Sequence, residues 1–135
     1  MKTKEQIYLG IDHGLKNIGL AFASQDTLLA VPFDIIDGTD QARAIEEIQA
    51  ICLNEEVDVI IIGLPISKKG EDSKQTQYVR RFIDQLKKKT TLPVIEEDER
   101  FSTLMAAKSS ESGDDSVSAA IILQSYLDRE FRKEK

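Results

Sequence analysis

The chain has 135 residues, 41% of them hydrophobic, and a formal net charge of −6, which suits one domain with its own core. We therefore expect a single domain over residues 1–135. With Cys52 as its only cysteine, the chain can form no internal disulfide, which fits a reducing compartment. Cys52 lies in an apolar helical pattern and no triad partner is evident, so we expect a core residue rather than a nucleophile. The N-terminus is polar, and no apolar run of membrane length follows it. These features predict a cytoplasmic protein that does not bind membranes.

Charge is unevenly distributed along the chain. Residues 68–89 contain eight basic and three acidic residues, a local charge of +5, so that the remainder carries −11. A negative chain is a poor partner for nucleic acid as a whole, but one basic segment can still contact phosphates. A solvated helix face explains the same pattern without any function.

Apolar patterning and turn signals divide the chain into five strands and a set of helices. Runs rich in Val and Ile, bounded by Gly, Pro or Asp, predict the strands, and apolar residues three or four positions apart predict the helices. The expected elements, in chain order, are strands at 6–12, 18–24 and 29–36, a helix containing 42–53, a strand at 57–62, a helix containing 79–86, a strand beginning at 92–95, a short helix after 101 and a last helix over 117–131.

The order of these elements predicts the topology. A short turn joins the first two strands, the third continues the meander, and helices then alternate with strands. The apolar run at 57–62 is typical of a buried parallel strand. We therefore expect an α/β fold with a mixed five-stranded sheet, three antiparallel meander strands followed by βαβ, flanked by helices. Element order alone leaves an unrelated three-layer α/β fold open.

An aspartate ends the first predicted strand. Asp is disfavoured inside strands, and Asp12 follows an apolar run, so its carboxylate must reach solvent or a partner. Gly14 and Gly19 would let the backbone approach whatever Asp12 holds. A plain hairpin with an aspartate cap is the alternative. The next residue, His13, should point to the opposite face of the strand, and we expect a turn residue there rather than a general base.

Two further acidic clusters follow later in the chain. Four consecutive acids, Glu96 to Glu99, repel one another unless they are solvated, paired or bound to a cation. Asp114 and Asp115 precede the last helix, where capping explains one of them. Between the clusters, Gly63-Leu64-Pro65 follows the central strand, at a position where α/β sheets often carry sites. An acidic loop, a helix cap and simple strand termination are the alternative explanations.

Together these segments resemble the YqgF family, also called RuvX, from Tyr8 to Asp128. The matching segments are Gly10-x-Asp12-x-Gly14-x-Lys16-x-Ile18-Gly19, Gly63-Leu64-Pro65, Asp98-Glu99-Arg100-x-Ser102-Thr103 and Asp115-x-x-x-Ala119-Ala120-x-Ile122-Leu123-Gln124. Members of this family are described as Holliday-junction resolvases or pre-16S rRNA nucleases. The resemblance implies an RNase H-like fold and a nuclease that hydrolyses phosphodiester bonds of structured nucleic acid with a divalent metal.

By position, the resemblance implies catalytic and metal-binding roles for Asp12, Glu99 and Asp115. Carboxylate ligands suit Mg²⁺ or Mn²⁺ rather than Zn²⁺, since the chain has one Cys and one His. Helical periodicity does not decide between Asp114 and Asp115. Small residues three and four positions after Asp115 favour it, because the helix can approach the sheet closely there. Asp98 also stays open beside Glu99.

Cations near these acids are candidates for binding the substrate, either precursor rRNA or branched DNA. The candidate contacts to phosphates are Lys16, Lys68, Lys69, Lys74, Arg80 and Arg100. A nuclease acting on junctions would need two active sites, so the chain is expected as a monomer or a homodimer.

Two other classes of function stay open. Actin-like sugar kinases and chaperone ATPases also begin with Asp-x-Gly near a hairpin, but they need a second similar domain that 135 residues cannot supply. A non-catalytic nucleic-acid-binding or ribosome-binding module is the other alternative. The short acidic stretch at 106–114, where relatives often carry a longer basic segment, favours that module.

Overall fold

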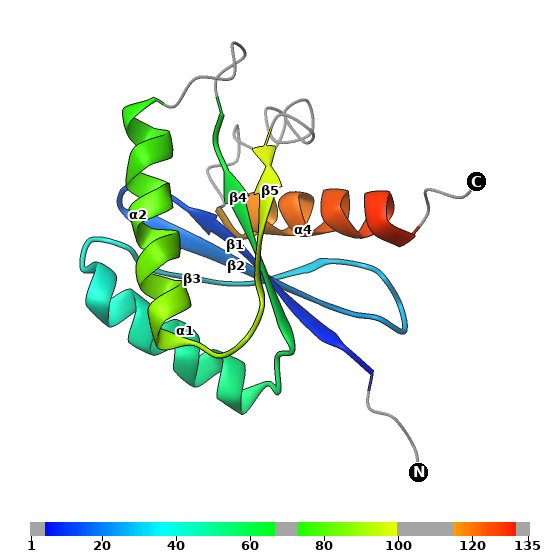
Figure 1. The fold of residues 1–135 in the computed structure, drawn as a ribbon. Coiled ribbons are helices and arrows are strands. Elements are labelled where there is room, and N and C mark those ends of the chain that lie inside the picture. Colours follow the sequence, from blue (N-terminus) through cyan, green and yellow to red (C-terminus); the bar gives the residue numbers. More distant parts are fainter. Residues whose placement is uncertain (1–4, 67–72, 100–114, 132–135) are drawn as a thin grey trace.

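The computed structural model describes residues 5–66, 73–99 and 115–131, and its five strands form one mixed sheet in the order β3-β2-β1-β4-β5 (Figure 1). The strands are β1 (Ile7–His13), β2 (Asn17–Ser24), β3 (Val31–Asp37), β4 (Val59–Leu64) and β5 (Val94–Asp98). β1 pairs antiparallel with β2, and β2 with β3, whereas β1–β4 and β4–β5 are parallel. The predicted α/β fold is confirmed.

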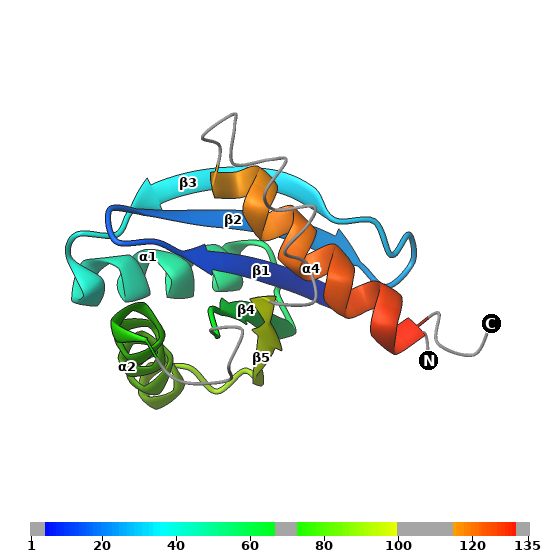
Figure 2. The same ribbon diagram turned by 90° about the horizontal axis from the view of Figure 1, so that it is seen from above.

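The helices cover the two faces of the sheet unequally. α1 (Gln41–Asn54) and α2 (Lys74–Lys89) lie on one face, and α4 (Asp115–Phe131) runs obliquely across the other (Figure 2). The short helix expected after residue 101 lies outside the described residues. None of the helices described is both long and apolar enough to cross a membrane.

Side chains of the central strands alternate between two cores. Leu9 and Ile11 of β1 pack under α1 and α2, and Tyr8 belongs to the cluster under α4. All six residues of β4 are buried, because helices cover this strand on both faces. Cys52 is buried as expected, but Leu53, the last apolar residue of the pattern that predicts the helix at 42–53, is 84% exposed. One step of 100° carries it past the narrow stripe that faces the sheet.

The first turn of α2 is tied to the end of β4. Ser73 caps the helix by accepting a hydrogen bond from the backbone N–H of Thr76. The buried Thr76 hydroxyl donates in turn to the carbonyl of Pro65, just after β4. α2 therefore begins over the edge of the sheet where β1 and β4 end. Asp40 caps α1 by accepting a hydrogen bond from the backbone N–H of Arg43. This cap follows Asp37-Gly38-Thr39, the residues that break the chain before the helix.

A buried ion pair joins β5 to α4. Glu97 is fully buried, and both of its carboxylate oxygens accept from the Arg129 guanidinium at 2.6 and 2.5 Å. The Ser125 hydroxyl donates to the same carboxylate at 3.1 Å. A bidentate guanidinium–carboxylate pair fixes orientation as well as distance. Glu97, an acid of the 96–99 cluster, therefore anchors the helix.

We expect Arg129→Ala to lower the free energy of unfolding by about 3 kcal/mol, because it leaves the Glu97 carboxylate buried without its partner. Chemical denaturation of Arg129→Ala, Glu97→Gln and the double variant measures the coupling. The double variant should lose less than the sum of the two single losses. Simple additivity would show that the two side chains do not stabilise each other.

Candidate functional site

Asp12 lies in a row of three neighbouring strands, between two glycines. In β2, Gly19 is its direct antiparallel partner. In β4, Gly63 follows Ile62, which is the parallel partner of Ile11. Residues in one such row share a face of the sheet. Asp12 is therefore flanked on both sides by positions without a side chain.

Backbone of α4 occupies the space over Gly19. A Cβ built on Gly19 would stand 1.9 Å from the carbonyl oxygen of Asp115, closer than any real contact. Gly10 makes a similar approach one strand away, where a Cβ would meet Ala119 O at 3.0 Å. Small side chains on the helix complete the fit, and Ala119 is fully buried. The first residue of α4 is thus held directly beside Asp12.

The Glu99 side chain occupies the space over the second glycine. A Cβ on Gly63 would stand 2.8 Å from Glu99 Oε2 and 3.2 Å from its Cγ. Gly63 is an interior position of β4, paired with Glu97, so strand termination does not explain it. The absent side chain lets Glu99, just beyond β5, lie over β4 toward Asp12. The structure thus brings the three predicted acids to one end of one face.

Burial and mutual repulsion perturb two of these acids. Burial, reinforced by the nearby charge of Asp115, raises the pKa of Asp12 to about 6. Burial, with the charges of Asp12 and Asp98, raises the pKa of Glu99 to about 7. Both groups therefore hold protons more tightly than carboxyl groups in water. Strongly shifted groups gathered at one end of a sheet are typical of functional sites.

These carboxylates are the donors that hard divalent cations take. Within residues 5–66, 73–99 and 115–131, however, no three acidic, histidine or cysteine side chains are close enough to form a metal-binding group. The donor set fits Mg²⁺ or Mn²⁺ in chemistry, and Asp12 is its middle member.

His13 points away from the acids, as strand alternation predicts. It is not the expected turn residue, since it is the last residue of β1 and only 3% exposed. Its ring stacks on Phe82 at 4.1 Å between centroids and lies 5.1 Å from Tyr78. Neither ring nitrogen has a hydrogen-bond partner among the residues that the structure describes, and burial lowers the pKa of His13 to about 4. His13 is therefore a neutral packing residue behind Asp12.

The candidate cations have separate surroundings. Lys16 and Lys74 are exposed in the β1–β2 turn and at the start of α2. Arg80 is half-buried and lies 3.8 Å from Glu96 of β5, which also pairs with Lys87 at 3.8 Å. Glu96 thus offsets part of the positive charge of α2. Lys68, Lys69 and Arg100 lie outside the described residues.

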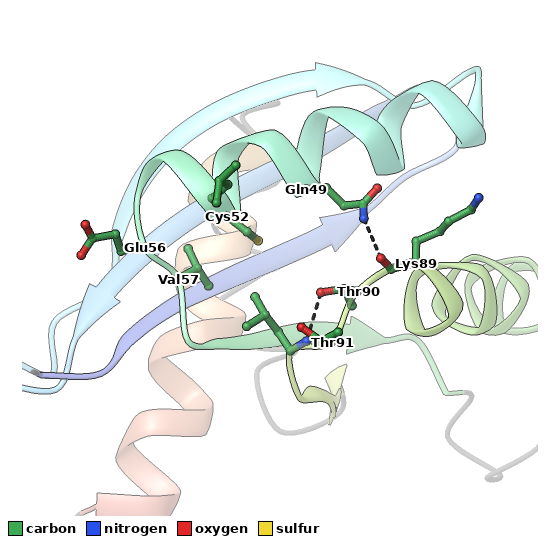
Figure 3. A pocket seen from close by; sticks show the side chains of 9 residues that line it. Gln49, Cys52, Glu56, Val57, Lys89, Thr90 and Thr91 are labelled. Atoms are coloured by element: carbon green, nitrogen blue, oxygen red, sulfur yellow. Dashed lines mark hydrogen bonds between the residues drawn. The ribbon is translucent and has the colours of Figure 1, made fainter.

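A pocket of about 390 Å³ lies at the other end of the sheet, between the C-terminal ends of α1 and α2 (Figure 3). Gln49 bridges its rim by donating to the Lys89 carbonyl at 2.6 Å. Cys52 lines it, and burial raises the pKa of the thiol to about 11, so the thiol stays protonated at neutral pH. No acid of the Asp12 row lines this pocket, which fits the prediction that Cys52 is not a nucleophile.

Two features of the site could not be predicted from local patterns. Glu97 was open as a metal-binding acid, but Arg129, 32 residues away, engages it. The sequence does contain a signal, because Glu97 lies in a predicted strand on the face that α4 covers. It does not show which basic side chain would pair with that carboxylate. The sequence analysis assigned no role to Tyr78, which lines a pocket together with Lys74 that is described below.

Comparisons with known proteins identify the family of this chain. The RuvX family, described as a Holliday junction resolvase, matches residues 6–129. A protein of Maridesulfovibrio salexigens named "Putative pre-16S rRNA nuclease" is 35% identical, covering 90% of this chain and 97% of its own length. A protein of the same name from Sulfurihydrogenibium sp. is also 35% identical, over 90% of this chain and 89% of its own.

The fold has a counterpart among solved structures. A structure titled "T. thermophilus RuvC in complex with Holliday junction substrate" has a TM-score of 0.63 and 12% identity, covering 93% of this chain and 96% of the other. At that identity the likeness concerns the fold, which is RuvC-like within the RNase H-like class. The family match spans nearly the whole chain and sets the actin-like kinase alternative aside. The chain belongs to the RuvX (YqgF) family.

Proposed function

We propose that this protein is a metal-dependent endonuclease that hydrolyses phosphodiester bonds of structured nucleic acid. The single observation that carries the proposal is the row in which Asp12 stands between Asp115 over Gly19 and Glu99 over Gly63. Precursor 16S rRNA is the first substrate to test, because relatives at 35% identity bear that name. A four-way DNA junction is the second, from the family description.

The proposed metal-binding residues are Asp12, Glu99 and Asp115, with Mg²⁺ or Mn²⁺ as the cation. When bound, the cation would relieve the negative charge that develops on the scissile phosphate and the leaving oxygen. The residues themselves supply a partly buried set of oxygen donors whose fixed backbone supports reduce the cost of ordering. Asp12 and Glu99 must lose their protons to bind, so metal affinity should fall as pH drops through about 7 and then 6.

Cleavage should require the row of acids. Wild-type protein with Mn²⁺ should cut precursor 16S rRNA and should not do so with a chelator. Asp12→Asn and Asp115→Asn keep the shape but remove a charge, so each should slow cleavage at least about a hundredfold.

The matched control is Asp114→Asn, which should keep its activity and, because asparagine caps a helix about as well as aspartate, its stability. If Asp114→Asn were inactive and Asp115→Asn active, the proposal would have named the wrong aspartate. Binding of nucleic acid without metal-dependent cleavage would favour the non-catalytic module instead.

Asp12 should destabilise the folded protein at neutral pH when no divalent cation is present. Its pKa is about 6 in the folded chain against an ordinary value of 3.8, so the folded state binds the proton more tightly. Stability therefore falls as pH rises from about 4 to about 6 and stays lower above that range. Asp12→Asn should raise the free energy of unfolding by up to about 3 kcal/mol at pH 8 and change it little at pH 4.

Denaturation at several pH values checks this, with Asp26→Asn in the exposed β2–β3 turn as the matched control without effect. Mn²⁺ should stabilise the wild type at pH 8 and not Asp12→Asn, because only a cation bound to the folded state shifts the equilibrium. Equal stabilisation of both proteins would remove Asp12 from the proposed ligand set.

A further inference from the structure

A second concave surface lies beside the end of β1, on the face opposite the acids. It has a volume of about 580 Å³, within the range of about 300–1,000 Å³ typical of sites for small ligands. The first two turns of α2 and the turn between β1 and β2 form it. Its lining residues are Leu15, Lys74, Gln75, Gln77, Tyr78 and Arg81.

The chemistry of this pocket is that of a nucleotide site. Lys74 and Arg81 bring two positive charges, and the described lining contains no acid, in a chain whose net charge is −6. Tyr78 is half-buried and offers a ring, and Leu15, 64% exposed, offers an apolar surface at the rim. Cations suit phosphates, and a fixed aromatic ring suits the face of a base.

The position of the pocket links it to the acids. The Tyr78 ring lies 5.1 Å from the ring of His13, the residue that follows Asp12. Leu15 is three residues after Asp12, so their Cα atoms are at most about 11 Å apart. His13, stacked at 4.1 Å on Phe82, holds the wall behind Tyr78 in place. A nucleic-acid strand that reaches from Asp12 to Tyr78 would therefore cross the edge of the sheet where β1 ends.

We propose that this pocket holds one unpaired nucleotide of the substrate, next to the scissile phosphate that would lie at the acids. The base stacks on Tyr78 against Leu15, and Lys74 and Arg81 contact the adjoining phosphates. The inference rests on the proposed nuclease function and narrows its substrate class. Bases inside a duplex are stacked on both faces, so only a bulge, loop, branch point or single strand can supply such a base.

Binding can be measured without cleavage in the Asp12→Asn background, by fluorescence anisotropy. The probes are an RNA duplex, the same duplex with one unpaired nucleotide, and the corresponding single strand, each also made as DNA. The bulged and single-stranded probes should bind more tightly than the duplex. Tyr78→Leu should weaken them about tenfold and leave the duplex unchanged, whereas Tyr78→Phe should keep the preference.

Charge and fold are controlled separately. Arg81→Gln should lower the salt slope of single-strand binding by about 0.7, and Lys88→Gln, at the far end of α2, should leave it unchanged. Leu15→Glu changes an exposed turn residue that the core does not need, and it should also weaken the bulged probe selectively. It tests the pocket even if Tyr78→Leu fails to fold.

Equal losses on duplex and bulged probes would overturn the pocket, since Tyr78 would then act only through the fold. A free mononucleotide that binds as tightly as the bulged probe would also overturn it, by making this a small-molecule site. These results are independent of the cleavage assay. If the wild type cuts rRNA while Tyr78→Leu and Leu15→Glu keep the preference for bulges, only the pocket proposal fails. If the wild type cuts no substrate but Tyr78→Leu and Leu15→Glu lose the preference for bulged probes, only the nuclease proposal fails.

Discussion

The close approach of α4 to the glycines of the sheet fixes most of what surrounds Asp12. A side chain at Gly19 would meet the Asp115 carbonyl at 1.9 Å, and one at Gly63 would meet both Ile122 at 2.6 Å and Glu99 at 2.8 Å. α4 can therefore lie this low only over these positions. At its other end, the Glu97–Arg129 pair fixes the direction in which the helix leaves the sheet. Two contacts, one steric and one ionic, thus determine the position of Asp115.

That arrangement sets stability against the proposed function. Burial and repulsion raise the pKa of Asp12 to about 6 and that of Glu99 to about 7, so each ionised carboxylate is a cost to the folded chain at neutral pH. Glu97, two residues before Glu99, has the opposite situation, because a guanidinium compensates its buried charge. At the end of β5, Glu97 therefore has a structural role, whereas a bound cation would offset the charge of Glu99.

Periodicity and turn signals were enough to predict the five strands, the antiparallel meander and the helices between the later strands, because each element repeats its pattern over several turns or alternations. Periodicity failed at Leu53, where the stripe is narrow. The expectation of a turn residue failed at His13, whose burial depends on Phe82 and Tyr78 across 65 or more residues of sequence. The three acids were identified by resemblance, and the physical reason for their convergence lay in Gly19 and Gly63. The sequence does not show which backbone or side chain will approach a given glycine. The roles of Gly19 and Gly63 therefore become visible only in the folded structure, where α4 and Glu99 lie over them.

Alternation along β1 connects the two halves of the proposed site. Successive residues of a strand face opposite sides, so Asp12 turns toward α4 and His13 toward α2. On one side the row of acids would meet the scissile phosphate, and on the other the ring of Tyr78 would meet a neighbouring base. Both sides depend on one strand end, which the antiparallel partner β2 and the parallel partner β4 hold from either flank. A substrate bound to both must bend around that edge with a base out of its stack. A regular duplex cannot do this without a cost in stacking energy, so the proposed site would favour interrupted helices over continuous ones.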